Sequence, residues 1–185
     1  MSLSLHTAIA ATVQSDSNRV NVETIEQAPP SPSAQVQQAE DRYQAGQLSE
    51  AIALWQQADT QYERNEDQLN QALVLSFLAT AFADLGQWPQ ANSAIDQAIL
   101  LLNAQSSNSD DTPRVFAQVL TAPGKLQLAQ GKASEALATW QQAESFYHKT
   151  NNANGVLGSQ INQARALQAQ GLYRRATDLL LHWLV

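Results

Sequence analysis

The sequence predicts an all-α protein, an α-solenoid of about four antiparallel helical hairpins, and three observations lead to this prediction. The segment SEAIALWQQA at 49–58 returns as SEALATWQQA at 134–143, with eight of ten residues identical at an offset of 85. Four glycines recur between amphipathic stretches at spacings of 40, 45 and 40 residues: Gly46, Gly86, Gly131 and Gly171. Hydrophobic residues make up 44% of the chain but aromatic residues only 6%, a composition typical of helices with small-residue packing faces.

The chain divides into two expected regions. Residues 1–33 contain Pro29, Pro30 and Pro32 and no sustained helical period, so we expect a disordered or extended tether. Residues 34–185 form the expected repeat domain, with units at about 34–65, 66–105, 113–148 and 154–185. Two interpretations of residues 1–13 stay open: a remnant of a secretory signal ending in Ala8–Ala11, although no Lys or Arg precedes it, or a disordered terminus. The compartment is unknown, with export to the periplasm or the medium slightly favoured over the cytoplasm.

Small residues define the expected contact between the two helices of each hairpin. Glycine adopts the left-handed conformation that ends one helix before the next begins. Alanines follow the glycines by five residues, and again seven residues later except in the last unit, where Trp183 takes that place: Ala51, Ala58, Ala91, Ala98, Ala136, Ala143 and Ala176. Alanine lets antiparallel helices approach closely. Four larger residues should fill the space beside them: Trp55, Ile95, Trp140 and Leu180.

Polar connections at 64–67, 106–112 and 149–154 separate the expected hairpins. Thr112 should place a capping oxygen before Pro113 in the first turn of a helix, and Pro89 suits a first turn after Gly86. Pro123 and Gly124 fall inside the first helix of the third unit and should kink or split it.

These repeats resemble the tetratricopeptide repeat (TPR). The second unit matches best, with Leu75, Leu78, Ala79 and Phe82 at first-helix positions and Ala91, Ile95 and Ala98 at second-helix positions. The units are longer than the usual repeat and lack its late proline. The segments GQLSEAIALWQQA, GKASEALATWQQAESFY and GSQINQARALQAQGLYRRA are similar to the N-terminal repeats of cyanobacterial proteins that end in a CHAT domain, a caspase-like peptidase module. That module uses a His and Cys pair, which has no counterpart here, so the resemblance implies a recognition region attached to a separate effector.

Composition argues against several classes of function. The net charge of -7, with no cluster of Lys or Arg, argues against nucleic acid as a partner. No apolar run approaches the length of a membrane span, so we expect no membrane insertion. The chain has no Cys, and its three histidines, His6, His148 and His182, are not spaced to share a helix face, so we expect no metal and no cofactor. Residues 155–159 only superficially suggest a phosphate loop and should begin a helix, and no constellation of catalytic groups can be assigned, so we expect no enzyme.

The TPR resemblance implies that the first helix of each hairpin lines a concave groove that binds a protein or peptide partner, as an extended or helical segment. The expected groove residues are Glu40, Tyr43, Gln44, Ser76, Thr80, Asp84, Gln118, Thr121, Lys125, Asn162, Arg165 and Gln168. This groove should be mostly polar and uncharged. Lys125 and Arg165, with Asn162 nearby, could receive an acidic side chain or chain end, although two ordinary solvated cations are the alternative.

The C-terminal helix carries an apolar cluster with no following repeat to cover it: Leu179, Leu180, Leu181, Trp183 and Leu184. A solenoid end normally has a polar cap. Two explanations stay open: the natural chain continues, or this end pairs with another copy in a homodimer. The second explanation gives the alternative function of a self-associating assembly module.

Overall fold

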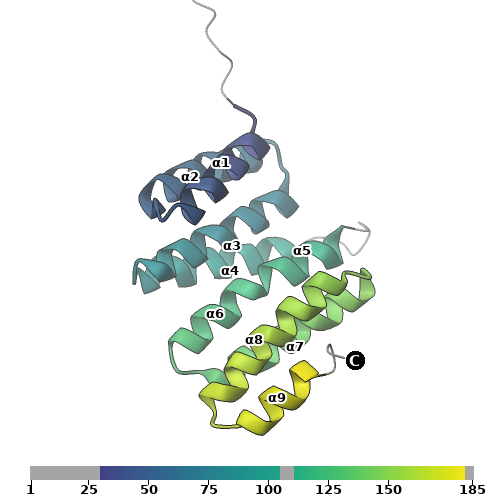
Figure 1. Cartoon of the computed structure of the whole chain (residues 1–185). Coiled ribbons are helices and arrows are strands. Elements are labelled where there is room, and N and C mark those ends of the chain that lie inside the picture. The colour runs from purple at the N-terminus through teal and green to yellow at the C-terminus, as the bar shows by residue number, and fades with distance from the viewer. Residues whose placement is uncertain (1–29, 105–110, 182–185) are drawn as a thin grey trace, which may run out of the picture.

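The computed structural model describes residues 30–104 and 111–181, and these ranges contain helices joined by turns. The helices are α1 (Pro32–Gln44), α2 (Leu48–Arg64), α3 (Gln68–Asp84), α4 (Trp88–Ala104), α5 (Thr112–Val119), α6 (Thr121–Ala129), α7 (Ala133–Lys149), α8 (Ala153–Ala169) and α9 (Tyr173–Leu181). They stack as successive hairpins from α1 and α2 at one end to α9 at the other (Figure 1). The expected all-α solenoid is confirmed. The expected tether lies outside the described residues, except that α1 already begins at Pro32.

Left-handed glycines turn the chain inside each hairpin, as expected. The four repeat glycines have positive φ angles between 71° and 78°. In the first hairpin the N–H of Gly46 donates to the carbonyl of Tyr43 at 3.0 Å, and the N–H of Gln47 donates to the carbonyl of Arg42 at 2.9 Å. These bonds occupy carbonyls at the end of α1 that have no partner within the helix.

Two non-glycine residues adopt the same left-handed conformation between hairpins. Glu66 has a φ of 57° after α2, and Asn151 has a φ of 52° after α7. Each is followed by an N-cap: Asp67 accepts from the N–H of Asn70 at 3.2 Å, and Asn152 accepts from the N–H of Gly155 at 2.9 Å. These turns lie 85 residues apart, so the internal duplication seen in the sequence includes the connections between hairpins.

The expected cap at Thr112 is wrong. Helix α5 already includes Thr112, and Asp111 holds the N-cap position with helical angles of φ -79° and ψ -21°. The Asp111 carboxylate accepts from Arg114 Nε at 3.2 Å. Thr112 lies within the first turn, and its hydroxyl is buried without a hydrogen-bond partner among the described residues. The proposed first-turn role of Pro89 is confirmed, since it is the second residue of α4.

The alanine positions pack as expected. All seven alanines of the pattern are at most 2% exposed, and Trp55, Ile95 and Trp140 beside them are buried. Leu180 is only partly buried, and Trp183 lies outside the described residues. The small side chains therefore sit where the helices of each hairpin meet, and the larger ones fill the space between helices.

The first helix of the third hairpin is split into α5 and α6, as Pro123 and Gly124 predict. The break itself lies earlier, at Leu120. Pro123 has no N–H to donate to the carbonyl four residues earlier, so the helix restarts with Pro123 in its first turn. A Cβ atom on Gly124 would lie only 2.4 Å from Trp140 Nε1. The glycine therefore lets the indole of Trp140 pack against α6 and donate to the carbonyl of Thr121 at 3.3 Å.

Three expectations concern isolated features. No helix in the described ranges is long and apolar enough to cross a bilayer. His148 lies in the last turn of α7 with 64% of its side chain exposed, whereas His6 and His182 lie outside the described residues. Residues 155–159 belong to the start of α8, as expected.

Candidate binding groove

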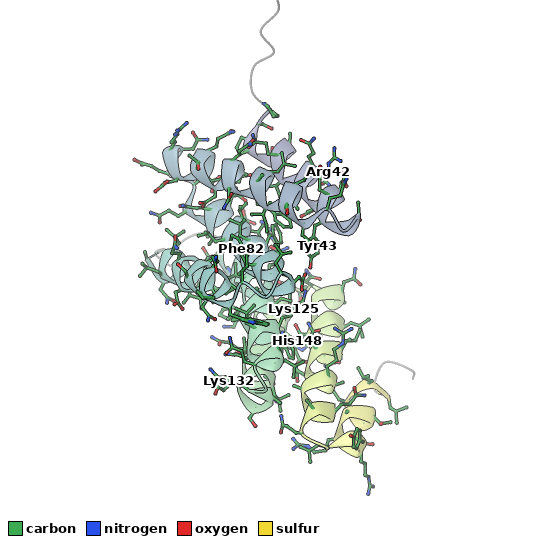
Figure 2. All side chains as sticks on the ribbon, turned by 90° about the vertical axis from the view of Figure 1, so that its left-hand side faces the viewer. Arg42, Tyr43, Phe82, Lys125, Lys132 and His148 are labelled. Atoms are coloured by element: carbon green, nitrogen blue, oxygen red, sulfur yellow. The ribbon has the colours of Figure 1, made fainter. Side chains whose placement is uncertain are left out.

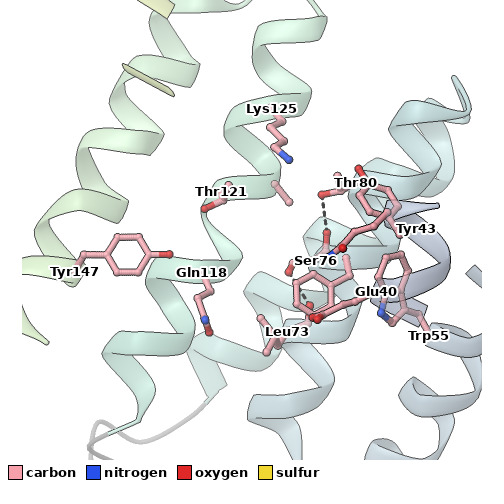
Figure 3. Close-up of a pocket in the computed structure, with 13 residues that line it drawn as sticks. Glu40, Tyr43, Trp55, Leu73, Ser76, Thr80, Gln118, Thr121, Lys125 and Tyr147 are labelled. Carbon is pink, nitrogen blue, oxygen red and sulfur yellow. Dashed lines mark hydrogen bonds between the residues drawn. The ribbon is translucent and has the colours of Figure 1, made fainter. Parts of the chain in front are cut away.

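A pocket of about 310 Å³ opens between the first helices of the first three hairpins (Figure 3). Helices α1, α3, α5 and α6 supply most of its wall, and α2 and α7 add one aromatic residue each. The lining residues are Glu40, Tyr43, Gln44, Trp55, Leu73, Ser76, Phe77, Thr80, Gln118, Thr121, Ala122, Lys125 and Tyr147. Because three hairpins meet here, the pocket exists only when the repeats are stacked.

The structure brings most of the expected groove residues together. Eight of them line the pocket: Glu40, Tyr43, Gln44, Ser76, Thr80, Gln118, Thr121 and Lys125. Asp84 lies at its edge, where it accepts a hydrogen bond from Tyr43. The three expected residues on α8, Asn162, Arg165 and Gln168, do not line this pocket. Lys125 and Arg165 therefore do not share the expected site for an acidic group within this pocket.

The floor of the pocket is aromatic and aliphatic, which differs from the mostly polar groove that we expected. Tyr43, Trp55 and Phe77 form a row in which successive ring centroids are 5.6 Å apart. Trp55 is only 2% exposed, and Leu73 lies one turn before Phe77 on α3. Tyr43 was among the expected groove residues, but Trp55, Leu73 and Phe77 were not, because Trp55 lies on a second helix and the expected first-helix positions were mostly polar. The available signal was that α3 is apolar nearly all round, which is typical of a helix covered on several sides.

Three hydroxyl groups of the pocket already donate their protons elsewhere. Ser76 Oγ donates to the carbonyl of Leu73 at 2.7 Å, and Thr80 Oγ1 donates to the carbonyl of Ser76 at 3.1 Å. Tyr43 Oη donates to Asp84 Oδ2 at 2.5 Å. A hydroxyl has one proton and two lone pairs, so towards a ligand these groups can act only as acceptors.

The Tyr43 phenol stays neutral because its surroundings disfavour the phenolate. Burial, the hydrogen bond to Asp84 and the negative charge of Asp84 raise the pKa of Tyr43 to about 12. The bond joins α1 to the end of α3, so it ties the first hairpin to the second at the edge of the pocket. Tyr43 therefore acts as a donor to Asp84 throughout the neutral pH range.

Two charged side chains line the pocket from different hairpins. Glu40 comes from α1 and Lys125 from α6, and neither forms a salt bridge within the described ranges. Lys125 points from α6 towards the end of the pocket that holds Thr80 and Tyr43 (Figure 3). Figure 2 shows Tyr43 and Lys125 in neighbouring positions along the stack.

Tyr147 forms the wall on the far side of Gln118 and Thr121 (Figure 3). Its ring packs against Gly155 so closely that a Cβ there would lie 2.2 Å from the ring. Burial raises the pKa of Tyr147, and a hydrogen bond to the Thr121 side chain opposes that shift. The pocket thus offers an aromatic floor, several hydrogen-bond acceptors and two opposite charges, which are groups suited to binding.

Comparisons with known proteins bear on the fold. No family model matches the chain, and a search of curated proteins found no match. Among solved structures, BtubC (BKLC) from P. vanneervenii is similar with a TM-score of 0.64 and 15% identity, over 85% of this chain and 65% of that chain. Two structures of a Podosopora anserina putative kinesin light chain with nearly identical TPR-like repeats have TM-scores of 0.57 and 0.52 at 23% identity. They match over 86% and 80% of this chain, and over 76% and 71% of theirs.

This chain therefore spans just under two thirds of the length of BtubC. At these identities the likeness concerns the fold, and it agrees with the stacked hairpins and left-handed turns described above. The chain has the fold of a TPR-like helical solenoid.

Proposed function

We propose that this protein is a non-enzymatic interaction scaffold that binds a peptide or helix of a partner protein on its concave surface. Solenoids of this kind generally present extended concave surfaces to other proteins. The observation that carries the proposal is the pocket between three successive hairpins, with a buried aromatic floor and a polar rim. Aromatic residues in desolvated pockets contribute much of the affinity at protein interfaces.

The groove can be tested with peptides selected from a random library on the full chain. Thr80→Arg places a bulky charged side chain in the pocket, and Ser93→Arg places the same side chain on the exposed surface of α4. We expect the selected peptides to bind Thr80→Arg at least about fivefold more weakly, because loss of a pocket contact of this kind changes the binding free energy by more than about 1 kcal/mol. Ser93→Arg should bind them like the wild type. Equal effects of the two variants would place the binding surface outside the groove.

A finer proposal comes from the resemblance to CHAT-domain proteins. In this proposal the repeats are the recognition region of a larger protein that also carries a peptidase-type effector domain, and the groove binds a segment of a partner or of that domain. The reading frame beyond Val185 in the natural gene tests it. A downstream module with a His and Cys pair would support it, and a stop codon directly after Val185 would reject it while leaving the groove proposal intact.

Self-association is the second candidate function, and exposed apolar side chains at α9 favour it. Tyr173 is 67% exposed and Leu181 is 48% exposed. If this end pairs with a second copy, the sedimentation coefficient should rise with concentration in the wild type, and Tyr173→Ser with Leu181→Ser should abolish the rise. Leu100→Ser on α4 is the control that should leave it unchanged, since Leu100 is 69% exposed and lies away from α9. A wild type that remains monomeric at all concentrations would exclude this function.

A further inference from the structure

We propose that the groove pocket receives a basic side chain, Lys or Arg, from the bound partner segment. This inference rests on the proposed function and specifies the chemistry of the residue that enters the pocket. It depends on three features of the pocket: the direction of its hydrogen bonds, the composition of its floor, and the position of its charges.

The hydrogen bonds of the pocket leave acceptors facing a ligand. The protons of Ser76, Thr80 and Tyr43 are held by the carbonyls of Leu73 and Ser76 and by Asp84. An ammonium or guanidinium group carries only donors, whereas a carboxylate carries only acceptors. Ser76 is buried, so a basic side chain can donate to the Thr80 and Tyr43 oxygens, whereas a carboxylate would face oxygen lone pairs there and could bind only near Lys125.

The floor and the nearest carboxylate also favour a cation. Tyr43 and Phe77, which are partly buried, present aromatic surface, with Trp55 packed behind them. Such a surface attracts a cation through the ring quadrupole and packs against the aliphatic stem of Lys or Arg. Glu40 lines the same pocket and forms no salt bridge within the described part of the chain. The charge complementarity extends to the whole protein, whose net charge of -7 attracts basic segments.

Lys125 opposes the incoming cation. Its ammonium points towards Thr80 (Figure 3), so it repels a second cation that approaches the Thr80 and Tyr43 oxygens, whereas Glu40 attracts one. Lys125 is thus a competitor for the same acceptors. Removing its charge should strengthen binding of a basic ligand, whereas removing the charge of Glu40 should weaken it.

The test uses NMR titration of the full chain with three blocked tripeptides: Ala-Arg-Ala, Ala-citrulline-Ala and Ala-Glu-Ala. The Trp55 indole N–H signal reports on the pocket floor. Citrulline has nearly the shape of arginine without its charge. We expect Ala-Arg-Ala to shift the signal saturably and to bind at least about threefold more tightly than the citrulline peptide, as cation–π and charge contributions at partly exposed sites suggest.

Three variants locate the effect. Glu40→Gln should weaken Ala-Arg-Ala by about threefold or more, and Lys125→Ala should strengthen it, since both act on the charge in the pocket. Glu135→Gln, the same substitution on the exposed start of α7, should leave it unchanged. Circular dichroism checks that each variant is folded.

Several outcomes would overturn the inference. These are no saturable shift with Ala-Arg-Ala, equal binding of the citrulline peptide, tighter binding of Ala-Glu-Ala, or no effect of Glu40→Gln. Tighter binding of the glutamate peptide would indicate instead an acidic ligand at Lys125. If library-selected peptides still lose affinity for Thr80→Arg while these tripeptides fail, the basic-residue inference is rejected and the groove proposal stands.

Discussion

Trp55 and Trp140 occupy the same place in the two copies of the repeated segment, yet their indole N–H groups meet different surroundings. Trp140 Nε1 donates to the carbonyl of Thr121, whereas Trp55 Nε1 is buried without an acceptor among the described residues. Gly124 packs against Trp140, and the residue 85 positions earlier is Ala39. The missing Cβ lets one indole reach the backbone of the facing helix, and we infer that the methyl group of Ala39 holds the other indole away.

Gly124→Ala should therefore destabilise the fold. The new Cβ would lie 2.4 Å from Trp140 Nε1, so the indole or α6 must shift. We expect a loss of about 1–3 kcal/mol in the free energy of unfolding, as for other overpacked cores. Gly158→Ala on α8 is the matched control, because a Cβ there meets nothing within 4 Å, and it should gain about 0.5–1 kcal/mol. Urea denaturation measures both, and a stable Gly124→Ala variant would contradict this account of Gly124.

Asp84→Asn should lower the pKa of Tyr43. Burial, the largest cause of the shift to about 12, remains in the variant, so the pKa should stay above the ordinary value of 10.0. Because the folded-state pKa is raised, the contribution of the neutral phenol to stability is complete below pH 10 and is lost as the pH rises towards 12. In Asp84→Asn this pH range should be narrower, because its upper end, the pKa of Tyr43 in the folded protein, is lower.

Ring-carbon NMR of labelled tyrosines can measure this pKa at each residue. Tyr62 serves as the internal control, since its pKa is raised by burial and then by the charge of Asp67, and Asp84 is not among the causes. An unchanged pKa of Tyr43 in Asp84→Asn would show that Asp84 does not perturb it.

At the scale of elements, the interface between α7 and α8 depends on a polar cluster that no sequence pattern indicated. Glu144 accepts hydrogen bonds from Gln160 Nε2 and Gln163 Nε2, each at 2.6 Å, and His148 Nε2 lies 3.6 Å from it. The dense glutamines of α8 look like an ordinary solvated face in the sequence, but Gln160 and Gln163 are buried. They were unpredictable because their burial follows from the packing of the next hairpin and not from local periodicity.

Glu144→Leu should reduce the free energy of unfolding by about 1–3 kcal/mol, because the Gln163 amide loses a charged acceptor in a buried site. Adding Gln163→Leu should recover part of this loss, since both polar partners are then removed. A double-mutant cycle by urea denaturation measures the coupling between the two residues. Additive effects would mean that the hydrogen bond contributes nothing to the interface.

At the scale of the whole molecule, much of the fold was predictable and the pocket only in part. The repeat glycines, the buried alanines and the break before Pro123 follow from local stereochemistry, which the sequence states directly. The polar rim was found because first-helix positions repeat. Trp55 in the floor was not, because it belongs to a second helix and reaches the pocket only through the stacking of hairpins. The left-handed turn at Glu66 was missed because a glycine usually marks that conformation.

The hydrophobic core is one continuous cluster from α1 to α6 and is divided into smaller clusters around α7, α8 and α9. One large cluster joins buried residues from α1 to α6, whereas α8 and α9 meet in a small one around Ala164, Leu167 and Ala176. In a solenoid each hairpin is stabilised by its own contacts and by those with its immediate neighbours, so local opening need not involve the whole chain. Hydrogen exchange should therefore be slowest in α3 and α4 and fastest in α9, where only Ala176 is buried.

The variant Leu167→Ala tests whether α8 and α9 open locally or the entire stack of helices unfolds cooperatively. Removing the buried Leu167 side chain should speed amide exchange in α8 and α9 and leave α3 and α4 unchanged, because its contacts lie in the small cluster. Leu78→Ala, the same truncation in the large cluster, should speed exchange in α3 and in the helices packed on it. Mass spectrometry of deuterium uptake resolves these segments. Equal acceleration of all helices by Leu167→Ala would show that the stack opens as one cooperative unit despite its divided core.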